Sequence, residues 1–533
     1  MKHYTGKKWF GTLVLILALT LLAACAGNTK KNEAASSPPP NSGSASNSPA
    51  QPSESSKPVP VKLKAYETDL NNPIPPGDTM NIPTMAYLGE KTNTILDVTF
   101  LSHGKYNEQL RLKMAAGEYP DFYWTGGFAN QETLANDMVL PLNDLIEQYG
   151  PNLKKVVPQY AWDAVTRKGQ IMAIPRFSGG GTDTDRQIFV RKDYLDKVGA
   201  KIPTTSDEFL DMLRLLRDND PDGNGKNDTI PFSGRQSFGW MENIFGMWGI
   251  DPSANTIYNG EVIPGYLHPN MKLALAFIHT MYAEKLLDNE FLSNTGSIWS
   301  QKLNSGQVAS YNHTVEQVAD FQKAIQDANP GVNVNVVGIP TPRGIGYDEG
   351  PLGNRKNPFG VSTIVMKSTK HPVEVIQLFD WLASEEGQVY IDLGIEGDTY
   401  RKEGDKFVYD AAKDKEVSSL RSPFAVTPLY FNKQTIEARY SPEDIARIDA
   451  AYAVAKDEGL PNPTVSMPMQ QALLDNPELS WYSGSYIQET MTKIVYGELP
   501  VDYFDTFSQT IRKQGGEQLI KEMTEWYNSN QAK

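Results

Sequence analysis

The sequence predicts an α/β fold, and three observations support this expectation. Short segments rich in β-branched and apolar residues recur along the chain, and segments with helical spacing of apolar residues lie between them. No internal repeat is present, which excludes solenoids and propellers. Strands interleaved with helices along a whole chain are typical of α/β proteins. A chain of 533 residues has room for several domains of about 100–200 residues each.

Residues 1–24 are predicted to be a lipoprotein signal peptide. They contain three lysines (Lys2, Lys7 and Lys8) and no acid, followed by an apolar run from Trp9 to Ala24. A membrane-spanning helix needs about 20 apolar residues, so this run is short for a span and typical of a signal-peptide core.

Cys25 is the only cysteine of the chain and the expected lipidation site. It follows Leu22, Ala23 and Ala24, which is the pattern of a bacterial lipobox. Small residues before the cut let the peptidase grip the backbone, and the thiol carries the diacylglycerol. The alternative is an ordinary secretory signal with a stray cysteine. Several acyl chains anchor stably, so the chain is expected on the extracellular face of the bacterial cell membrane.

Residues 25–60 are predicted to be a lipidated, disordered tether. Residues 26–60 contain nine serines and seven prolines but no aromatic residue. Such a composition cannot bury enough apolar surface to offset the chain entropy lost on folding. The segment is therefore expected to act as a flexible stalk between lipid and domain.

The globular body is expected from residue 61 to residue 533. A capping box at Thr205–Glu208 precedes Phe209, Met212, Leu213 and Leu216, which have the spacing of one helix face. Strands are expected at 61–66, 95–101, 187–191, 332–339 and 359–366. Further helices are expected at 106–116, 140–149, 271–287, 373–383 and 504–526.

A calcium loop is predicted directly after the helix that begins near Thr205. The run from Asp220 to Asp228 fits the first half of an EF-hand loop, with Gly225 at the sixth position where the chain must turn. Pro231 stands where an EF-hand has its bidentate glutamate, so the site would lie outside a true EF-hand. The alternative is an Asx-rich turn that holds only water. The expected ligands are the side chains of Asp220, Asp222, Asn224 and Asp228 and the carbonyl oxygen of Lys226.

Charge and motifs limit the classes of function. The chain has 50 basic and 64 acidic residues and a formal net charge of −14, which argues against a nucleic-acid partner. Nucleophile-elbow, zincin and phosphate-loop motifs are all absent. No catalytic residue is therefore expected.

Two ring-rich segments are candidates for sugar binding. One spans 238–248, and the other spans 121–127 in a loop-like context. Sugars stack their C–H faces on aromatic rings, although most such rings belong to a core. Trp124 and Trp240 are expected at a ligand cleft because both lie in glycine-rich, turn-like surroundings.

Several pieces of the chain, in this order and spacing, resemble the extracellular solute-binding lipoproteins of carbohydrate ABC importers. The chain is most similar to the lipoprotein-A-type and alginate-binding members of that family. The pieces are Leu112–Asp121, Ile171–Pro175, Val190–Gly199, Pro203–Glu208, the calcium loop with Ile230–Pro231, Ser384–Gly387, Gly394–Gly397, and Val501–Asp505 ahead of Gly515–Gly516.

The resemblance implies a two-lobed periplasmic-binding-protein-like fold of type II, with a ligand cleft between two α/β lobes. The lobes are expected at roughly 61–180 plus 310–380, and 181–309 plus 381–533. The protein would be a monomer that delivers an oligosaccharide to the permease subunits of an importer. The calcium ion would be structural.

Arg176 and Arg191 lie near the expected inter-lobe region, where they could clamp a uronate carboxylate. The alternative is that Arg191 stabilises the fold through an acid. Two other functions stay open on the sequence alone. One is a peptide or signal-molecule receptor of the same fold, and the other is a calcium-dependent enzyme that degrades polysaccharides.

Overall fold

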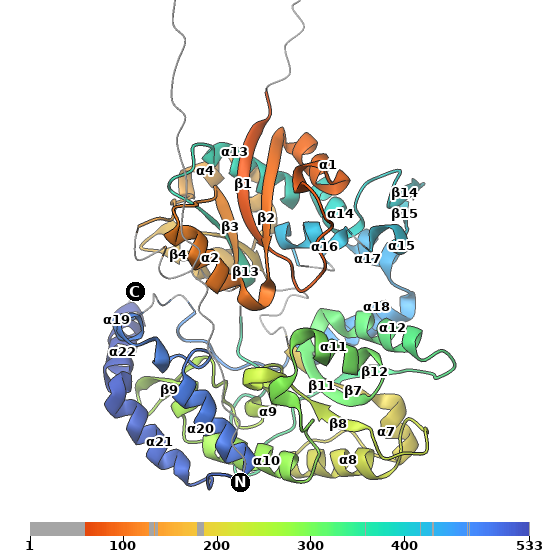
Figure 1. Ribbon diagram of the computed structural model, residues 1–533, viewed down its shortest axis with the longest axis vertical. Coiled ribbons are helices and arrows are strands. Elements are labelled where there is room, and N and C mark those ends of the chain that lie inside the picture. The colour runs from red at the N-terminus through yellow and green to blue at the C-terminus, as the bar shows by residue number, and fades with distance from the viewer. Residues whose placement is uncertain are drawn as a thin grey trace, which may run out of the picture. The chain divides into compact units, whose positions relative to one another are not determined.

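Two separate β-sheets organise the chain, each within its own lobe (Figure 1). The computed structural model describes residues 59–126, 133, 137–177, 186–357, 359–415, 417–428, 431–465, 467 and 470–531. The expected signal peptide, Cys25 and nearly all of the expected tether lie outside the described residues.

The sheet of the first lobe has the strand order β2-β1-β3-β13-β6. β1 runs parallel to β2 and β3, whereas β13 is antiparallel to both β3 and β6. The strands are β1 (Val61–Thr68), β2 (Thr94–Leu101), β3 (Phe122–Gly126), β6 (Ile174–Phe177) and β13 (Phe359–Val365). The helices are α1 (Pro83–Thr92), α2 (Tyr106–Ala115), α4 (Asn143–Tyr149), α5 (Pro151–Val156), α6 (Gln159–Ala164), α13 (Pro372–Ala383), α14 (Glu385–Leu393), α15 (Ala411–Asp414), α16 (Ser418–Arg421) and α17 (Lys433–Arg439), with hairpins β4–β5 (Thr166–Arg167, Gln170–Ile171) and β14–β15 (Tyr400–Glu403, Lys406–Tyr409).

The sheet of the second lobe has the strand order β12-β7-β11-β8. β7 is antiparallel to both neighbours, and β11 is parallel to β8. The strands are β7 (Arg186–Arg191), β8 (Ile230–Ser233), β11 (Val308–Thr314) and β12 (Val336–Ile339), with the hairpin β9–β10 (Asn255–Tyr258, Glu261–Pro264). The helices are α7 (Lys192–Val198), α8 (Ser206–Asp218), α9 (Glu242–Gly246), α10 (Met271–Ala283), α11 (Gly296–Asn304), α12 (Val318–Ala328), α18 (Pro442–Ala455), α19 (Gln471–Asp475), α20 (Ser485–Tyr496), α21 (Tyr503–Ile511) and α22 (Glu517–Gln531).

Each lobe has its own hydrophobic core. In the first lobe the rings of Phe122 and Phe379 meet edge to face between β3 and α13. In the second lobe the core continues from β7 and α8 to α20–α22, while Phe189 and Tyr311 belong to a separate cluster beneath α12 and α18. No cluster of buried apolar side chains joins the two lobes among the described residues.

The chain crosses between the lobes three times. It passes to the second lobe between β6 and β7, returns between β12 and β13, and passes again between α17 and α18. The expected lobe bounds differ from the sheets, because β11 and β12 pair with β7 and not with the first sheet. Residues 310–339 therefore lie in the second lobe, and β14, β15 and α15–α17 remain with the first.

The expected helix at 504–526 is interrupted. α21 ends at Ile511, and the wider turn at 512–516 places Gly515 at φ 112° before α22 begins. A side chain is rarely tolerated at this φ, so Gly515 permits the bend. The other expected strands and helices are present, although the expected strand at 332–339 is shortened to β12.

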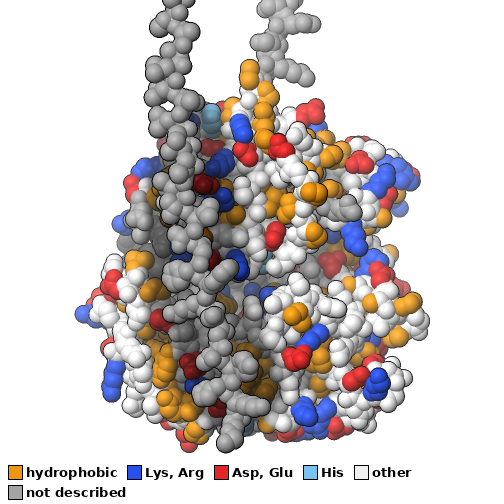
Figure 2. All heavy atoms as spheres, viewed as in Figure 1, with side chains coloured by type: hydrophobic (Ala, Val, Ile, Leu, Met, Phe, Trp, Pro, Cys, Tyr) orange, Lys and Arg blue, Asp and Glu red, His pale blue; other side chains and the backbone are white. Residues whose placement is uncertain are grey.

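Figure 2 shows basic and acidic side chains mixed over the face in view. Within the described part of the chain, none of the helices combines the length and the apolar character that a membrane crossing requires.

Candidate functional site

The strand directions bring two sheet edges together. The carboxyl ends of β1, β3 and β6 lie at the same edge as the amino end of β13. In the second lobe the carboxyl ends of β8, β11 and β12 lie beside the amino end of β7. Two crossings, β6 to β7 and β12 to β13, join these same edges, so the edges face one another. Ligands of open α/β sheets bind outside the carboxyl ends of the strands.

Side chains from the two lobes approach each other here. A Cβ atom built on Gly296 would lie 3.1 Å from Nη2 of Arg235, in the second lobe, and 3.5 Å from Nδ2 of Asn71, in the first. Glu316, which follows β11, favours the charged form of Arg176, at the end of β6. The inter-lobe region is therefore built from polar and charged groups.

Two exposed side chains of this region have pKa values that desolvation shifts. Tyr482 is 61 % exposed, yet the protein around it raises its pKa through desolvation, followed by the nearby charge of Glu242. His103 is also exposed, and desolvation lowers its pKa, with Arg235 adding to the shift.

In the first lobe, Glu67 is the buried acid of the site. It is 1 % exposed, and its Oε2 has no hydrogen-bond partner in the described structure. Burial raises the pKa of Glu67 well above its usual value, although the positive charge of Arg176 opposes the rise. Nη1 of Arg176 donates to the carbonyl of Ser422 at 3.3 Å, and burial lowers the pKa of Arg176.

In the second lobe, Trp240 is half-buried, and the side chains of Arg186 and His313 contact its ring system. The guanidinium of Arg186 lies 4.6 Å from the centre of its rings, and the His313 ring stacks on it at 4.0 Å. Arg186 forms an ion pair with Glu242, which also accepts a hydrogen bond from Asn312 at 3.2 Å. Burial, aided by nearby positive charge, lowers the pKa of His313 to about 3, so its ring is neutral at pH 7.

The four expected ligand-binding residues have different surroundings. Arg176 and Trp240 lie at the facing edges. Trp124 is 7 % exposed and packs edge to face against Tyr106 with ring centres 5.0 Å apart. The stacking of sugar on Trp124 and Trp240 stays a prediction, because protein groups already contact both rings in this structure.

The contacts of Arg191 lie within the second lobe, and its role in binding a uronate stays a prediction. Arg191 is 1 % exposed, and Nε and Nη2 donate to the two oxygens of Asp193 at 2.9 and 2.6 Å. Its guanidinium also lies over the Tyr194 ring at 3.8 Å. A buried guanidinium needs such pairing to offset its desolvation, which is the alternative that the sequence left open.

Four residues of the site were not expected from the sequence: Glu67, Arg186, Arg235 and Tyr482. Glu67 and Arg235 lie at or beside the carboxyl ends of β1 and β8, so the rule that ligands bind at carboxyl ends could have found them once the strand directions were known. Arg186 begins β7 and reaches the same edge because β7 is antiparallel to its neighbours. Tyr482 follows a short helical turn and carries no such signal.

The expected calcium loop is a tight turn held by its own oxygens. The Asp220 carboxylate accepts hydrogen bonds from the backbone of Gly223, Asn224 and Gly225 at 2.9–3.1 Å. The Asn224 amide donates to Asp222 at 2.8 Å and to Asp228 at 2.9 Å. Gly223 and Gly225 have φ values of 74° and 82°, which a turn this sharp requires.

The donor set of this loop fits calcium in its chemistry. Its side chains offer hard oxygen atoms, which Ca²⁺ prefers. Hydrogen bonding between the two acids lowers the pKa of Asp220, whereas desolvation and Asp220 raise the pKa of Asp222. A divalent cation would relieve this crowding of like charge. The described residues hold no group of three or more acidic, histidine or cysteine side chains arranged as a metal cage.

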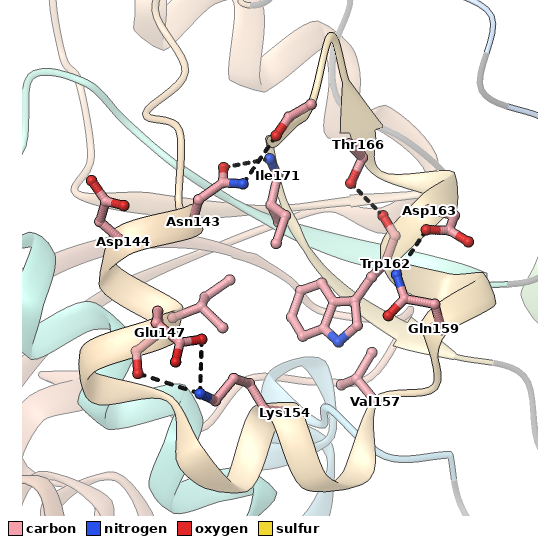
Figure 3. Close-up of a pocket in the computed structure, with 12 residues that line it drawn as sticks. Asn143, Asp144, Glu147, Lys154, Val157, Gln159, Trp162, Asp163, Thr166 and Ile171 are labelled. Atoms are coloured by element: carbon pink, nitrogen blue, oxygen red, sulfur yellow. Dashed lines mark hydrogen bonds and ion pairs between the residues drawn. The ribbon is translucent and has the colours of Figure 1, made fainter. Parts of the chain in front are cut away.

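A separate pocket lies on the first lobe, among α4, α5, α6 and the β4–β5 hairpin (Figure 3). It has a volume of about 690 Å³. The Trp162 ring faces its interior, and Lys154 pairs with Glu147 at 2.9 Å along its wall. None of its lining residues belongs to the facing sheet edges.

Comparisons with known proteins agree with this architecture. The family model described as bacterial extracellular solute-binding protein matches residues 76–389. The chain is 24 % identical to lipoprotein LipO of Bacillus subtilis, over 99 % of this chain and 100 % of that protein. It is 25 % identical to the polygalacturonan/rhamnogalacturonan-binding protein YtcQ of the same species, over 98 % and 99 % of the two chains.

Solved structures share the fold. The substrate-binding protein FusA of Streptococcus pneumoniae, in complex with kestose, matches with a TM-score of 0.68 and 19 % identity, over 89 % of this chain and 99 % of that chain. Alginate-binding protein AlgQ2, solved without calcium ion, matches with a TM-score of 0.66 and 21 % identity, over 88 % and 98 %.

Proposed function

Because the chain belongs to the family of bacterial extracellular solute-binding proteins, we propose that it binds an oligosaccharide between its two lobes and delivers it to the permease of an ABC importer. The observation that carries this proposal is the pair of polar sheet edges that face each other and are joined by the β6–β7 and β12–β13 crossings. The family binds solutes and does not convert them, so the enzyme alternative is set aside.

The names of similar proteins support an oligosaccharide as the solute. FusA is described as a fructooligosaccharide-binding component of an ABC transporter, and YtcQ as a polygalacturonan/rhamnogalacturonan-binding protein. Sugar hydroxyls need donors and acceptors held in place, together with a flat ring face. Tyr482 offers an exposed ring and Trp240 a half-buried one in the inter-lobe region.

Lipidation at Cys25 would hold this domain at the membrane that contains the permease. Several acyl chains would anchor the chain stably, and residues 26–60 would let the domain move above the surface. The extracellular family and the similarity to a lipoprotein support this arrangement.

Calcium at the loop 220–228 would have a structural role. Similar solved structures include an EF-hand mutant of FusA and AlgQ2 without calcium ion. Asp220, Asp222, Asn224, Asp228 and the carbonyl of Lys226 would hold the ion. The loop lies between α8 and β8, so calcium would stabilise that connection.

Calorimetric titration of the full chain, purified in detergent, tests the function. Kestose, maltotriose, trigalacturonate and a mixture of short peptides are the probes. We expect saturable binding of at least one saccharide, and chromatography should recover that saccharide unchanged. Binding of peptides alone, or release of shorter sugars, would contradict the proposal.

A further inference from the structure

Arg235 has no partner for its guanidinium within the described structure. The residue follows β8 directly after Ser233 and Gly234 and is half-buried. Its backbone N–H donates to Gly239, but its side chain forms no hydrogen bond or ion pair with any described residue. Most half-buried arginines of this lobe are paired, as Arg186 is with Glu242.

The guanidinium of Arg235 lies where the lobes meet. Its Nη2 and the amide nitrogen of Asn71, in the first lobe, both lie within 3.5 Å of the point where a Cβ atom of residue 296 would stand. Residue 296 is glycine, so no side chain occupies this point. The group is therefore presented to the inter-lobe region and not to the core of its own lobe.

The charges that act on Arg235 are one attracting acid and one repelling cation. Arg186 repels Arg235, and Glu242, which Arg186 already pairs, is the acid that attracts it. The nearby rings of His103 and His313 have lowered pKa values and stay neutral at pH 7. Asp69 contacts the backbone of His103 on the first-lobe side.

A partly desolvated cation without a hydrogen-bond partner is costly, and a carboxylate is its best planar partner. We propose that Arg235 binds the carboxylate of an acidic, uronate-containing oligosaccharide. This inference rests on the proposed function, since it names the chemical class of the oligosaccharide. Arg235 takes the place that Arg191 was given from the sequence, while Arg176 already contacts Ser422 and is attracted by Glu316.

The test compares two ligands that share one sugar chain but differ in charge, because esterification neutralises each carboxylate. Trigalacturonate and its full methyl ester are titrated into the full chain, with kestose as a neutral ligand of another class. The variants are R235Q, R235K and, as a matched control, R401Q, because Arg401 is an exposed residue of β14 paired with Glu403. Far-ultraviolet circular dichroism and melting curves check that each variant folds.

The wild type and R401Q should bind trigalacturonate roughly ten- to a hundredfold more tightly than the ester, as expected for a charge-assisted hydrogen bond. In R235Q the ratio of the affinity for trigalacturonate to the affinity for its ester should fall to near one. In R235K the ratio should lie between the wild-type and R235Q values, because lysine cannot form the bidentate pair. An unchanged ratio in folded R235Q would overturn the inference. Binding of kestose without binding of trigalacturonate would also overturn it and leave the proposed function standing. Binding of none of these sugars would count against both.

Discussion

Glu67 illustrates how one buried acid couples stability to pH. Its folded pKa is raised by burial, so in the window between the ordinary carboxyl pKa and the raised value the unfolded chain is ionised while the folded chain keeps its proton. The folded state therefore loses stability as pH rises through this window.

The variant E67Q removes this dependence. We expect E67Q to be more stable than the wild type at about pH 8, by about 1 kcal/mol, because glutamine resembles the protonated acid. The difference should vanish near pH 4. Melting temperatures at both pH values check this. A less stable E67Q at pH 8 would mean that Glu67 is ionised and paired electrostatically with Arg176.

The residue types of the site could be predicted, but only some of the positions. Rings and arginines were expected, and Trp240 and Arg176 lie at the facing edges. Arg191 has the same chemistry but pairs with Asp193 two residues away, and Arg235 has no partner among the described residues. Such pairing depends on side-chain geometry, which spacing along the chain does not reveal.

At the scale of elements, the capping box before α8 predicted the start of this helix almost completely. Thr205 accepts a hydrogen bond from the backbone of Glu208 at 3.3 Å, as the capping box predicts. The reciprocal bond differs by one residue, because Glu208 accepts from the N–H and hydroxyl of Thr204, both at 2.7 Å.

Removal of this cap should destabilise α8. T205A is expected to lower the free energy of unfolding by about 1 kcal/mol. T205S keeps the hydroxyl and should stay within a few tenths of a kcal/mol of the wild type. Urea unfolding of the three proteins measures the effect, and equal midpoints would show that the cap contributes nothing.

The loop at 220–228 gives a prediction about metal. Calcium at 100 times its dissociation constant should stabilise the fold by about 2.7 kcal/mol, and a chelator should remove this gain. Because the pKa of Asp222 is raised, protons compete with calcium as pH falls, so the gain should shrink in acid. D222N should lose the response, whereas D348N, at an exposed aspartate of the second crossing, should keep it. A melting temperature unaffected by chelation would leave the loop as a plain Asx turn.

Most strands and helices followed from local patterns, but their grouping into lobes did not. The sequence predicted strands near β1, β2, β7, β12 and β13, yet the expected lobe bounds placed residues 310–339 with the wrong sheet. β11 and β12 pair with β7 over more than a hundred residues of chain separation. Such long-range pairing is set by tertiary packing, which periodicity does not encode.

At the scale of the whole molecule, charges on opposite lobes favour closure. Glu316 of the second lobe stabilises the charge of Arg176 in the first. We expect E316Q to weaken ligand binding a few-fold, in keeping with a partly exposed pair that contributes up to about 1 kcal/mol. E90Q, at an exposed acid of α1, should bind as the wild type does. Titration of each variant with the same saccharide checks this. Unchanged affinity in E316Q would show that the attraction between Glu316 and Arg176 does not favour closure.

The central claim is that the two lobes bind a saccharide between them and release it unchanged. Small-angle X-ray scattering tests this claim most directly. The full chain is measured in detergent with and without the saccharide selected by titration, and the recovered saccharide is then examined for cleavage. We predict a smaller radius of gyration with the ligand and an intact saccharide afterwards. An unchanged radius at saturation, or a cleaved saccharide, would contradict the account.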